Sequence, residues 1–340
     1  MMKRRHGHFW FILTLIAVLV GCGNSNVSGS PDGESPQTED GAFPEKPITV
    51  FVGFPAGGST DLAARTAAEV VKKYVPNGAE FVIENKPGGG GAVAATDVVN
   101  ATGDGYTLGF SPFGPFTLTP HYGNTTYSYD DIIPIAQTVT SSYIFAVKAD
   151  APWQTFEEWL DHVQEQPGSF TYGTPGARSG PQVAMEALSL ETGMDLSTVP
   201  FEGNAPAKTA LLGGHVDGIV LSASDIVPSV ENGELRALLY FGKEKPQGLP
   251  DDVPTADEMG FVSFDFGFFF FGPKELDVTV RDQLSEAFEQ AMNDPELIEA
   301  YEKLYLVPSY ASPDELTTLI EAEYVTNEEI VKAAGLDQEE

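Results

Sequence analysis

Three glycine-rich segments, each between an expected strand and an expected helix, are the parts of this sequence best suited to bind a ligand. They are 54–61 (FPAGGSTD), 172–180 (YGTPGARSG) and 200–206 (PFEGNAP). Glycine lets the backbone come close to a ligand, and the first turn of the following helix leaves several amides without an acceptor. Together with the helix dipole, these amides form an anion site that needs no lysine or arginine. The alternative is that these residues are only turn glycines and helix caps.

Side chains in and beside these segments could complete an anion site. Further donors are the hydroxyl groups of Ser59, Thr60, Thr174 and Ser179. Arg178 could hold a second carboxylate through two parallel N–H bonds, or could be a surface arginine that pairs with nearby acids. Asp225 could meet a ligand amino group or could cap a helix.

The elements that position these segments alternate between short apolar strands and helices. The first half predicts strands at 47–52, 81–84 and 106–110, with helices at 60–74 (capped by Thr60 or Asp61) and 92–100. The second half predicts strands at 170–172, 198–201, 218–221 and 235–240, with helices at 182–192 and 206–212. The apolar runs 143–148 and 268–271 could cross between the halves, and helices at 279–292, 295–305 and 313–334 close the chain. This repetition predicts two α/β lobes.

An ordered series of short motifs carries a family resemblance. The series is FPAGGSTD (54–61), ENKPGGGG (84–91), GDGYTL (103–108), YGTPG (172–176), VPFEG (199–203), LLGGHVD (211–217) and VPT (253–255). It resembles the substrate-binding proteins of tripartite tricarboxylate transporters, the Bug/TctC family, over about residues 46–334. The resemblance implies a two-lobed periplasmic-binding-protein-like fold, with mixed sheets flanked by helices and a ligand cleft between the lobes. It places lobe 1 at 46–142 plus 268–340 and lobe 2 at 143–267.

The resemblance also implies which residues contact the ligand. In this family the first loop and the second-lobe loop grip a carboxylate of the ligand, partly through ordered water, and the third loop lines its far end. Carried over, the contacts are Phe54, Ala56, Gly57, Ser59, Thr60 and Asp61 in lobe 1, and Thr174, Gly176, Ser179, Gly203 and Asn204 in lobe 2. Gly58, Arg178 and Asp225 are added to the expected contacts from the residues themselves, and Arg178 stands where relatives commonly have a small residue. The chain departs from the family after the second loop, where relatives often have a histidine and this sequence reads Pro181-Gln182-Val183-Ala184.

The N-terminus resembles an export signal of a bacterial lipoprotein. A basic start at 3–5 precedes an apolar run at 9–20, which is shorter than the roughly 20 residues of a membrane span. Leu19-Val20-Gly21-Cys22 resembles a lipobox, so we expect a signal peptide at 1–21 and lipidation of Cys22; the alternative is an ordinary signal peptide with a chance cysteine. Residues 22–45 are rich in Ser, Gly, Pro and acids and are expected to form a flexible tether.

Composition excludes several functions. The formal net charge of −32 repels nucleic acid, and the single cysteine excludes a disulfide or a multi-cysteine metal cluster within the chain. The sequence has no GxSxG elbow, no GxxxxGK[ST] loop and no HExxH, so no catalytic residue, metal or cofactor is expected. The acids Glu321, Glu323, Glu328 and Glu329 near the C-terminus are expected to be a solvated helix face.

The function expected from these observations is that of a non-enzymatic receptor outside the cytoplasm, anchored to the membrane by lipid. It would capture a small carboxylate (a di- or tricarboxylate, an aromatic carboxylate or an amino acid) and deliver it to the subunits of a membrane permease. Two alternatives remain open. One is a receptor of the same fold that serves a membrane sensor kinase, and the other is an extracellular enzyme that acts on an anionic substrate.

Overall fold

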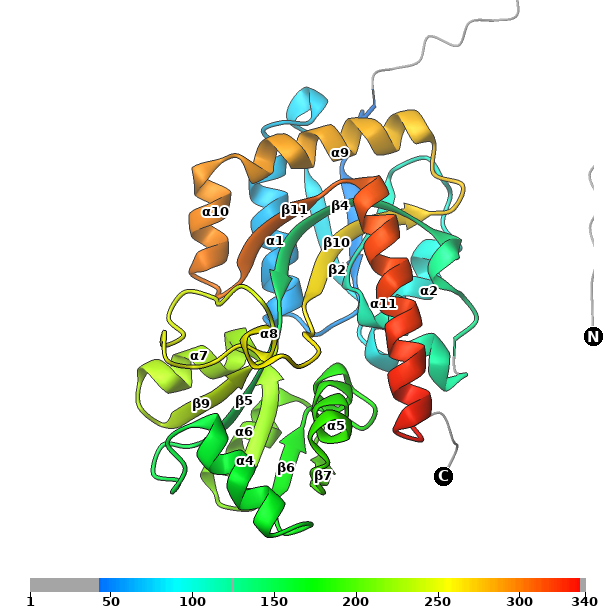
Figure 1. The fold of residues 1–340 in the computed structure, drawn as a ribbon. Helices are drawn as coiled ribbons and strands as arrows, with labels where there is room; N and C mark the ends of the chain where they lie inside the picture. The colour runs from blue at the N-terminus through cyan, green and yellow to red at the C-terminus, as the bar shows by residue number, and fades with distance from the viewer. Residues whose placement is uncertain (1–42, 124, 337–340) are drawn as a thin grey trace, which may run out of the picture. The chain divides into compact units, whose positions relative to one another are not determined.

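A computed structural model describes residues 43–123 and 125–336 of the chain. They belong to one compact unit that contains two β-sheets (Figure 1). The expected signal peptide, Cys22 and nearly all of the expected tether lie outside the described residues. No helix among the described residues combines the length and the apolar character that crossing a membrane requires.

The first sheet, here called sheet A, has six strands in the order β11-β4-β10-β3-β1-β2. The strands are β1 Ile48–Val52, β2 Phe81–Asn85, β3 Thr107–Pro112, β4 Ile132–Ser141, β10 Phe266–Pro273 and β11 Val307–Ala311. Strands β1, β2 and β3 are parallel, whereas β10 is antiparallel to both β3 and β4. The sheet is therefore mixed, and the carboxyl ends of its parallel strands lead into the first predicted loop and into α3.

The second sheet, here called sheet B, has five strands in the order β7-β6-β8-β5-β9. The strands are β5 Tyr143–Lys148, β6 Thr171–Thr174, β7 Ser197–Pro200, β8 Gly218–Ser222 and β9 Leu235–Tyr240. Strands β6, β7 and β8 are parallel, and β5 is antiparallel to its neighbours β8 and β9. The carboxyl ends of the three parallel strands lead into the second predicted loop, the third predicted loop and α7.

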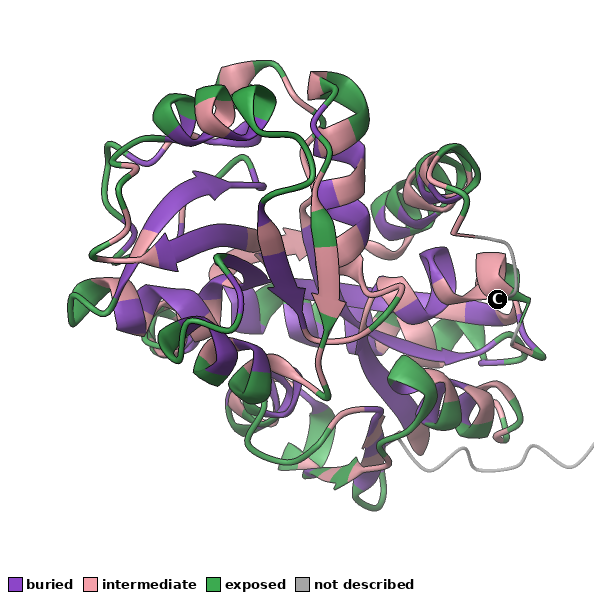
Figure 2. Ribbon diagram, turned by 90° about the horizontal axis from the view of Figure 1, so that it is seen from below, coloured by how far each residue is buried: buried purple, intermediate pink, exposed green. Residues whose placement is uncertain are grey.

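Helices cover both faces of each sheet, so the central strands are buried, whereas the edge strands β2, β7 and β11 are partly exposed (Figure 2). Around sheet A the helices are α1 Ser59–Val71, α2 Ala92–Val99, α3 Gly114–Thr117, α9 Val278–Met292, α10 Pro295–Glu302 and α11 Pro313–Ala333. In the other half they are α4 Phe156–Glu165, α5 Gly180–Thr192, α6 Asn204–Leu212, α7 Ala223–Glu231 and α8 Ala256–Met259. The apolar cores lie between these helices and the sheets, with α1, α9 and α10 on one face of sheet A and α2, α3 and α11 on the other.

Strand β10 shows how tightly the core of sheet A is packed. All eight of its residues are buried, and the ring of Phe271 crosses the face of β3 where Gly109 stands. A Cβ at Gly109 would lie 2.1 Å from that ring, which is well inside van der Waals contact. Glycine is therefore required at this position for close packing rather than for a turn.

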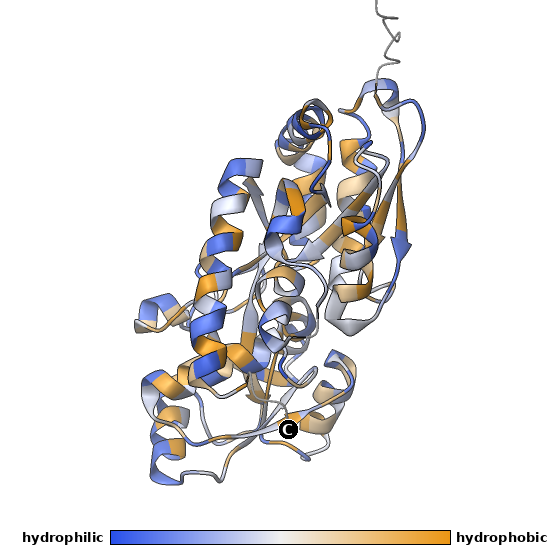
Figure 3. Ribbon diagram, turned by 90° about the vertical axis from the view of Figure 1, so that its right-hand side faces the viewer, coloured by the Kyte–Doolittle hydropathy of each residue, from blue (hydrophilic) through white to orange (hydrophobic). Residues whose placement is uncertain are grey.

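Two neighbouring chain segments connect the halves. Strand β4 of sheet A ends at Ser141 and β5 of sheet B begins at Tyr143, while Phe266 at the start of β10 pairs with Ser141. The hydroxyl of Ser142 donates to the carbonyl oxygen of Phe264 over 2.6 Å. This hydrogen bond joins the two segments in which the chain crosses from one sheet to the other, one between β4 and β5 and one just before β10. Helix α11 has one apolar side, visible in Figure 3, and its Val331 packs with Val183 of α5. The C-terminal helix therefore contacts both halves.

Most expected elements are present, several with shifted ends. Strands β5 and β9 have the expected bounds, but the apolar runs 143–148 and 268–271 each lie inside one sheet and do not themselves cross. Helix α1 begins at Ser59 with Gly58 as its N-cap, so neither Thr60 nor Asp61 caps it. The sequence analysis missed β4, β11, α3, α4, α7 and α8.

Candidate functional site

The first glycine-rich loop connects β1 to the start of α1. Residues 55–58 are exposed, and no side chain caps the helix. Within the described residues, the amides of Ser59, Thr60 and Asp61 have no hydrogen-bond acceptor. This 13-residue helix therefore presents three unpaired donors at the positive end of its dipole.

Asp61 organises this loop from inside the protein. Its side chain is buried, and its carboxylate accepts from the Gly57 amide over 2.8 Å, from Arg65 Nε over 3.0 Å and from Asn85 Nδ2 over 2.9 Å. Burial raises the pKa of Asp61, but the hydrogen bonds from Arg65, Gly57 and Asn85 outweigh burial and hold the pKa below its ordinary value. Asp61 therefore remains ionised and fixes the shape of the loop.

These contacts bear on two expectations about the first loop. The Gly57 amide donates a hydrogen bond to Asp61, so this amide is not available to a ligand in this structure. Glycine is still needed at position 57 because its φ is 82°. Asp61 accepts from three donors and shapes the loop, and its expected contact with a ligand stays a prediction. Asn85 also donates to the carbonyl oxygen of Phe54 over 3.0 Å, so it is a loop residue that the sequence analysis missed, although the motif ENKPGGGG contained it.

The second glycine-rich loop uses its hydroxyl groups internally. Thr174 Oγ1 and Ser179 Oγ both donate to the carbonyl oxygen of Gly176, over 3.1 Å and 2.8 Å. These hydroxyl groups hold the loop closed, so their hydrogens are not available to a ligand in this arrangement. The donors that remain are backbone amides at the start of α5, where those of Gly180 and Gln182 have no acceptor within residues 43–123 and 125–336.

Arg178 and Gln182 set the backbone of this loop. Arg178 has a φ of +57°, its amide donates to Gln182 Oε1 over 2.7 Å, and its carbonyl oxygen accepts from the Tyr122 hydroxyl over 2.9 Å. The guanidinium carbon lies 5.5 Å from the centre of the Tyr122 ring. Gln182 therefore supports the loop, and Tyr122 connects the loop to the sheet A half.

The third glycine-rich loop leads into α6 and is joined to α7. Gly203 has a φ of +115°, and Asn204 Nδ2 donates to Asp225 Oδ2 over 2.6 Å. Burial raises the pKa of Asp225, and the contacts with Asn204 and Lys208 only partly oppose this effect. Asp225 lies in the first turn of α7, whose N-cap is Ser222, so it bridges two helix starts rather than capping α7.

A cluster that the sequence analysis missed lies where the two halves meet. Burial raises the pKa of Tyr143, and the charges of Glu323 and Tyr122 raise it further. The hydroxyl oxygen of Tyr143 lies 2.1 Å from the position that a Cβ on Gly180 would occupy, so it stands at the start of α5. Glu323 of α11 accepts from the Thr117 hydroxyl over 2.9 Å. Glu323 is thus not part of a solvated face, contrary to the sequence-based expectation.

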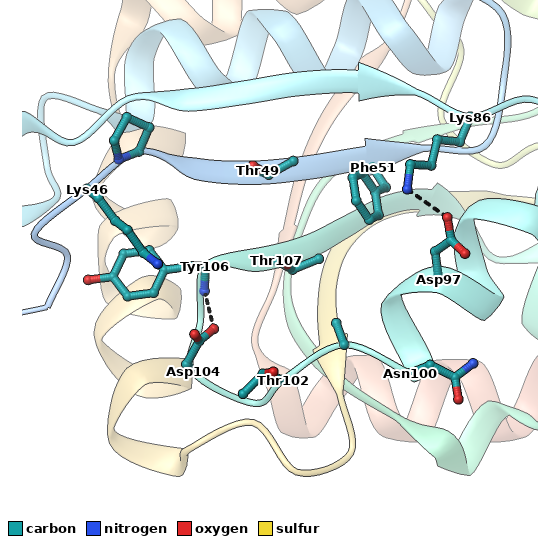
Figure 4. A pocket seen from close by; sticks show the side chains of 12 residues that line it. Lys46, Thr49, Phe51, Lys86, Asp97, Asn100, Thr102, Asp104, Tyr106 and Thr107 are labelled. Carbon is teal, nitrogen blue, oxygen red and sulfur yellow. Dashed lines mark hydrogen bonds and ion pairs between the residues drawn. The ribbon is translucent and has the colours of Figure 1, made fainter. Parts of the chain in front are cut away.

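A hollow of about 650 Å³ lies elsewhere, beside β1, β3 and the end of α2 (Figure 4). Its cations are already engaged, because Lys86 Nζ pairs with Asp97 over 2.7 Å and Lys46 Nζ lies 4.2 Å above the Tyr106 ring. None of the expected ligand contacts lines it. No group of three or more potential metal ligands is present in the part of the chain that the structure describes.

Comparison with known proteins decides what kind of site this is. Residues 63–336 match the profile of the family described as the tripartite tricarboxylate transporter family receptor, TctC. The chain belongs to this family. Its members are solute-binding receptors and not enzymes, so the glycine-rich loops belong to a receptor. The expected family is confirmed.

Relatives of this TctC-family receptor cover nearly all of it. A UPF0065 protein from the gbd 5′ region of Cupriavidus necator is 33% identical over 308 residues, covering 88% of this chain and 91% of the relative. A TctC solute-binding protein from Polaromonas has a TM-score of 0.74 at 28% identity and covers 86% of this chain and 99% of its own. MatC from Rhodopseudomonas palustris, solved with bound malate, has a TM-score of 0.71 at 26% identity, with coverages of 85% and 100%. These likenesses confirm the expected fold class.

Proposed function

We propose that this TctC-family receptor captures a small carboxylate through the backbone amides at the starts of α1 and α5, and delivers it to a membrane permease. The observation that carries the proposal is that the first turns of both helices hold amides without acceptors among the described residues. In Figure 1, α1 lies above and α5 below the level at which the chain passes from one sheet to the other. MatC, a relative of the same fold, binds malate.

Charge also supports recognition by backbone amides. With 50 acidic and 18 basic residues, the receptor repels anions at long range. Paired helix dipoles and unpaired amides attract a carboxylate at short range, where the distant acids are screened by salt. Arg178 faces Tyr122 and supports the second loop, so we do not assign it to a second ligand carboxylate.

We further propose a division into two lobes, 46–142 with 268–340 and 143–267, and lipidation at Cys22. The strands of sheet B fall within the second range, and those of sheet A fall outside it except for the first two residues of β10. Such lobes could move as bodies about the paired crossings near Ser142 and Phe264.

Malate and other carboxylates are expected to raise the melting temperature of the purified protein. A ligand at 100 times its Kd stabilises the folded state by about 2.7 kcal/mol, which corresponds to a shift of several degrees. A thermal-shift screen should include di- and tricarboxylates, aromatic carboxylates and amino acids, with uncharged sugars as controls. A shift produced only by sugars would refute the proposal.

Gly180→Ala is expected to weaken carboxylate binding by tenfold or more. The added Cβ would lie 2.1 Å from the Tyr143 hydroxyl oxygen, and Tyr143 is stacked on Phe266 with ring centres 4.8 Å apart, so the start of α5 must shift. Overpacking of this kind costs about 1–3 kcal/mol of stability. Gly114→Ala, at the first residue of α3, is the matched control, because its Cβ would meet no atom within 4 Å. Calorimetric titration with malate compares the two; equal affinities would show that the start of α5 is outside the site.

A further inference from the structure

Glu323 lies in the middle of α11 and is joined to the sheet A half through a buried threonine. Thr117, at the end of α3, donates its hydroxyl hydrogen to Glu323 Oε1 over 2.9 Å. Asn327, one turn further along α11, donates to the Thr117 hydroxyl over 3.3 Å. Thr117 and Asn327 are both buried, so the carboxyl group of Glu323 is held in one place from one side.

The other side of Glu323 faces the second half of the receptor. Thr117, which donates to Glu323, is followed by Leu118, and Leu118 clusters with Val183 in the first turn of α5. The Tyr143 hydroxyl group stands at Gly180, the first residue of α5. Val331 of α11 packs against Val183 of α5. The Glu323 carboxyl group is therefore close to the amides that the proposed function assigns to the ligand.

Within the described residues, the carboxyl group of Glu323 forms no ion pair. The titratable groups whose charges interact with that of Glu323 are Asp265, from the segment before β10, and Tyr143 of β5. Burial raises the pKa of Glu323 to about 7, the hydrogen bonds of Thr117 and Asn327 lower it in part, and Asp265 raises it further.

A bound carboxylate beside Glu323 would bring two negative charges together, and protonation of Glu323 would remove one of them. An ionised Glu323 beside a bound carboxylate would repel it, whereas a neutral Glu323 would not and could donate a hydrogen bond. Two carboxyl groups that share a site commonly retain one proton between them.

We propose that Glu323 couples ligand capture to proton uptake, so that an ionised carboxylate binds to the receptor in which Glu323 is the neutral acid. This inference rests on the proposed function and adds proton linkage to it. The proton comes from bulk water and resides on the Glu323 carboxyl group, whose Oε1 continues to accept from Thr117. Affinity for a fully ionised carboxylate then falls as the pH rises above about 7, by up to about tenfold per pH unit.

The test is calorimetric titration of the full-length protein with malate between about pH 6.5 and about pH 8.5, in buffers of different ionisation enthalpy. We expect the wild-type protein to take up between about half a proton and one proton per malate near pH 7.5. Glu323→Gln, which keeps the acceptor for Thr117, should bind with no linked proton and with an affinity independent of pH. Glu321→Gln removes an exposed charge from the same helix and should behave as wild type.

A second measurement does not depend on how the variant folds. The pKa of Glu323 in the wild-type protein, followed by carboxyl ¹³C NMR, should rise when malate is added. Binding without proton uptake, or an unchanged Glu323 pKa on binding, overturns the linkage and leaves the proposed function intact. If neither wild type nor Glu323→Gln binds any carboxylate of the panel even at about pH 6.5, the proposed function is wrong and the linkage is wrong with it.

Discussion

Asp61→Ala is expected to lower the free energy of unfolding by about 2–3 kcal/mol and to weaken carboxylate binding. The substitution removes the acceptor for the Gly57 amide, Arg65 and Asn85, and hydrogen bonds to a charged group contribute about 1.5–3 kcal/mol each when buried. Arg65 is about half exposed, so water can replace its hydrogen bond to Asp61. The expected loss of unfolding free energy therefore stays near the contribution of one buried hydrogen bond. Urea unfolding near neutral pH measures the stability change.

The dependence of this effect on pH follows from the lowered pKa of Asp61. A carboxyl group with a lowered pKa in the folded state stabilises the protein above its ordinary value of 3.8 and loses that contribution as the pH falls. The difference between wild type and Asp61→Ala should therefore shrink in acid. Glu69→Ala, on the exposed side of the same helix, is the control and should change stability by less than about 0.5 kcal/mol. An Asp61→Ala effect no larger than this control would remove Asp61 from its proposed role in the loop.

Glu323→Gln is expected to stabilise the ligand-free protein at neutral and alkaline pH. The pKa of Glu323 is raised from 4.5 to about 7, so the folded state binds more protons than the unfolded state across this interval. Stability contributed by the group is then complete below about pH 4.5 and is lost as the pH rises to about 7. The raised pKa of Glu323 sets an upper limit of about 3 kcal/mol on the stability that Glu323→Gln gains. Because the Glu323 side chain is partly exposed, we expect a gain of about 1–3 kcal/mol.

The measurement is the free energy of unfolding of both proteins across this pH range without ligand. The advantage of Glu323→Gln should grow from about pH 4.5 to about pH 7 and then remain constant. Asp225 and Asp265 also have raised pKa values, so wild type alone does not isolate Glu323, and the difference between the two proteins is the informative quantity. A difference that is constant across the range would show that Glu323 titrates normally.

Several of the expected ligand contacts form hydrogen bonds within the glycine-rich loops and support the shape of those loops. Thr174 and Ser179 donate to Gly176, Asn204 donates to Asp225, and Asp61 accepts from Gly57. What they leave exposed to a ligand is main chain rather than side chain. Under the proposed function, such a receptor would recognise the geometry of a carboxylate group, and residues from other elements would select the remainder of the ligand.

The sequence by itself determined the family, the alternation of strands and helices and the three glycine-rich loops, because these depend on short-range patterns. Strands β5 and β9 could be placed to the residue since β5 is apolar up to its last residue, Lys148, and Arg236 is the one charged residue within β9. Strand β4 was missed because Gln137 and Thr138 interrupt its apolar pattern, and both are buried against partners distant in sequence. Gln137 donates to Ser309, and Thr138 accepts from Tyr301.

Only the tertiary structure decided which groups of the loops are already paired and which residues join the site from outside the motifs. Glu323 resembles its exposed neighbour Glu321 in the sequence, and helical periodicity does not separate the two. Its surroundings depend on Thr117 of α3, which lies 206 residues away in the sequence and donates to its carboxyl group. The cost of burying a charge depends on all the groups packed around it, and a pattern along one helix cannot contain that information.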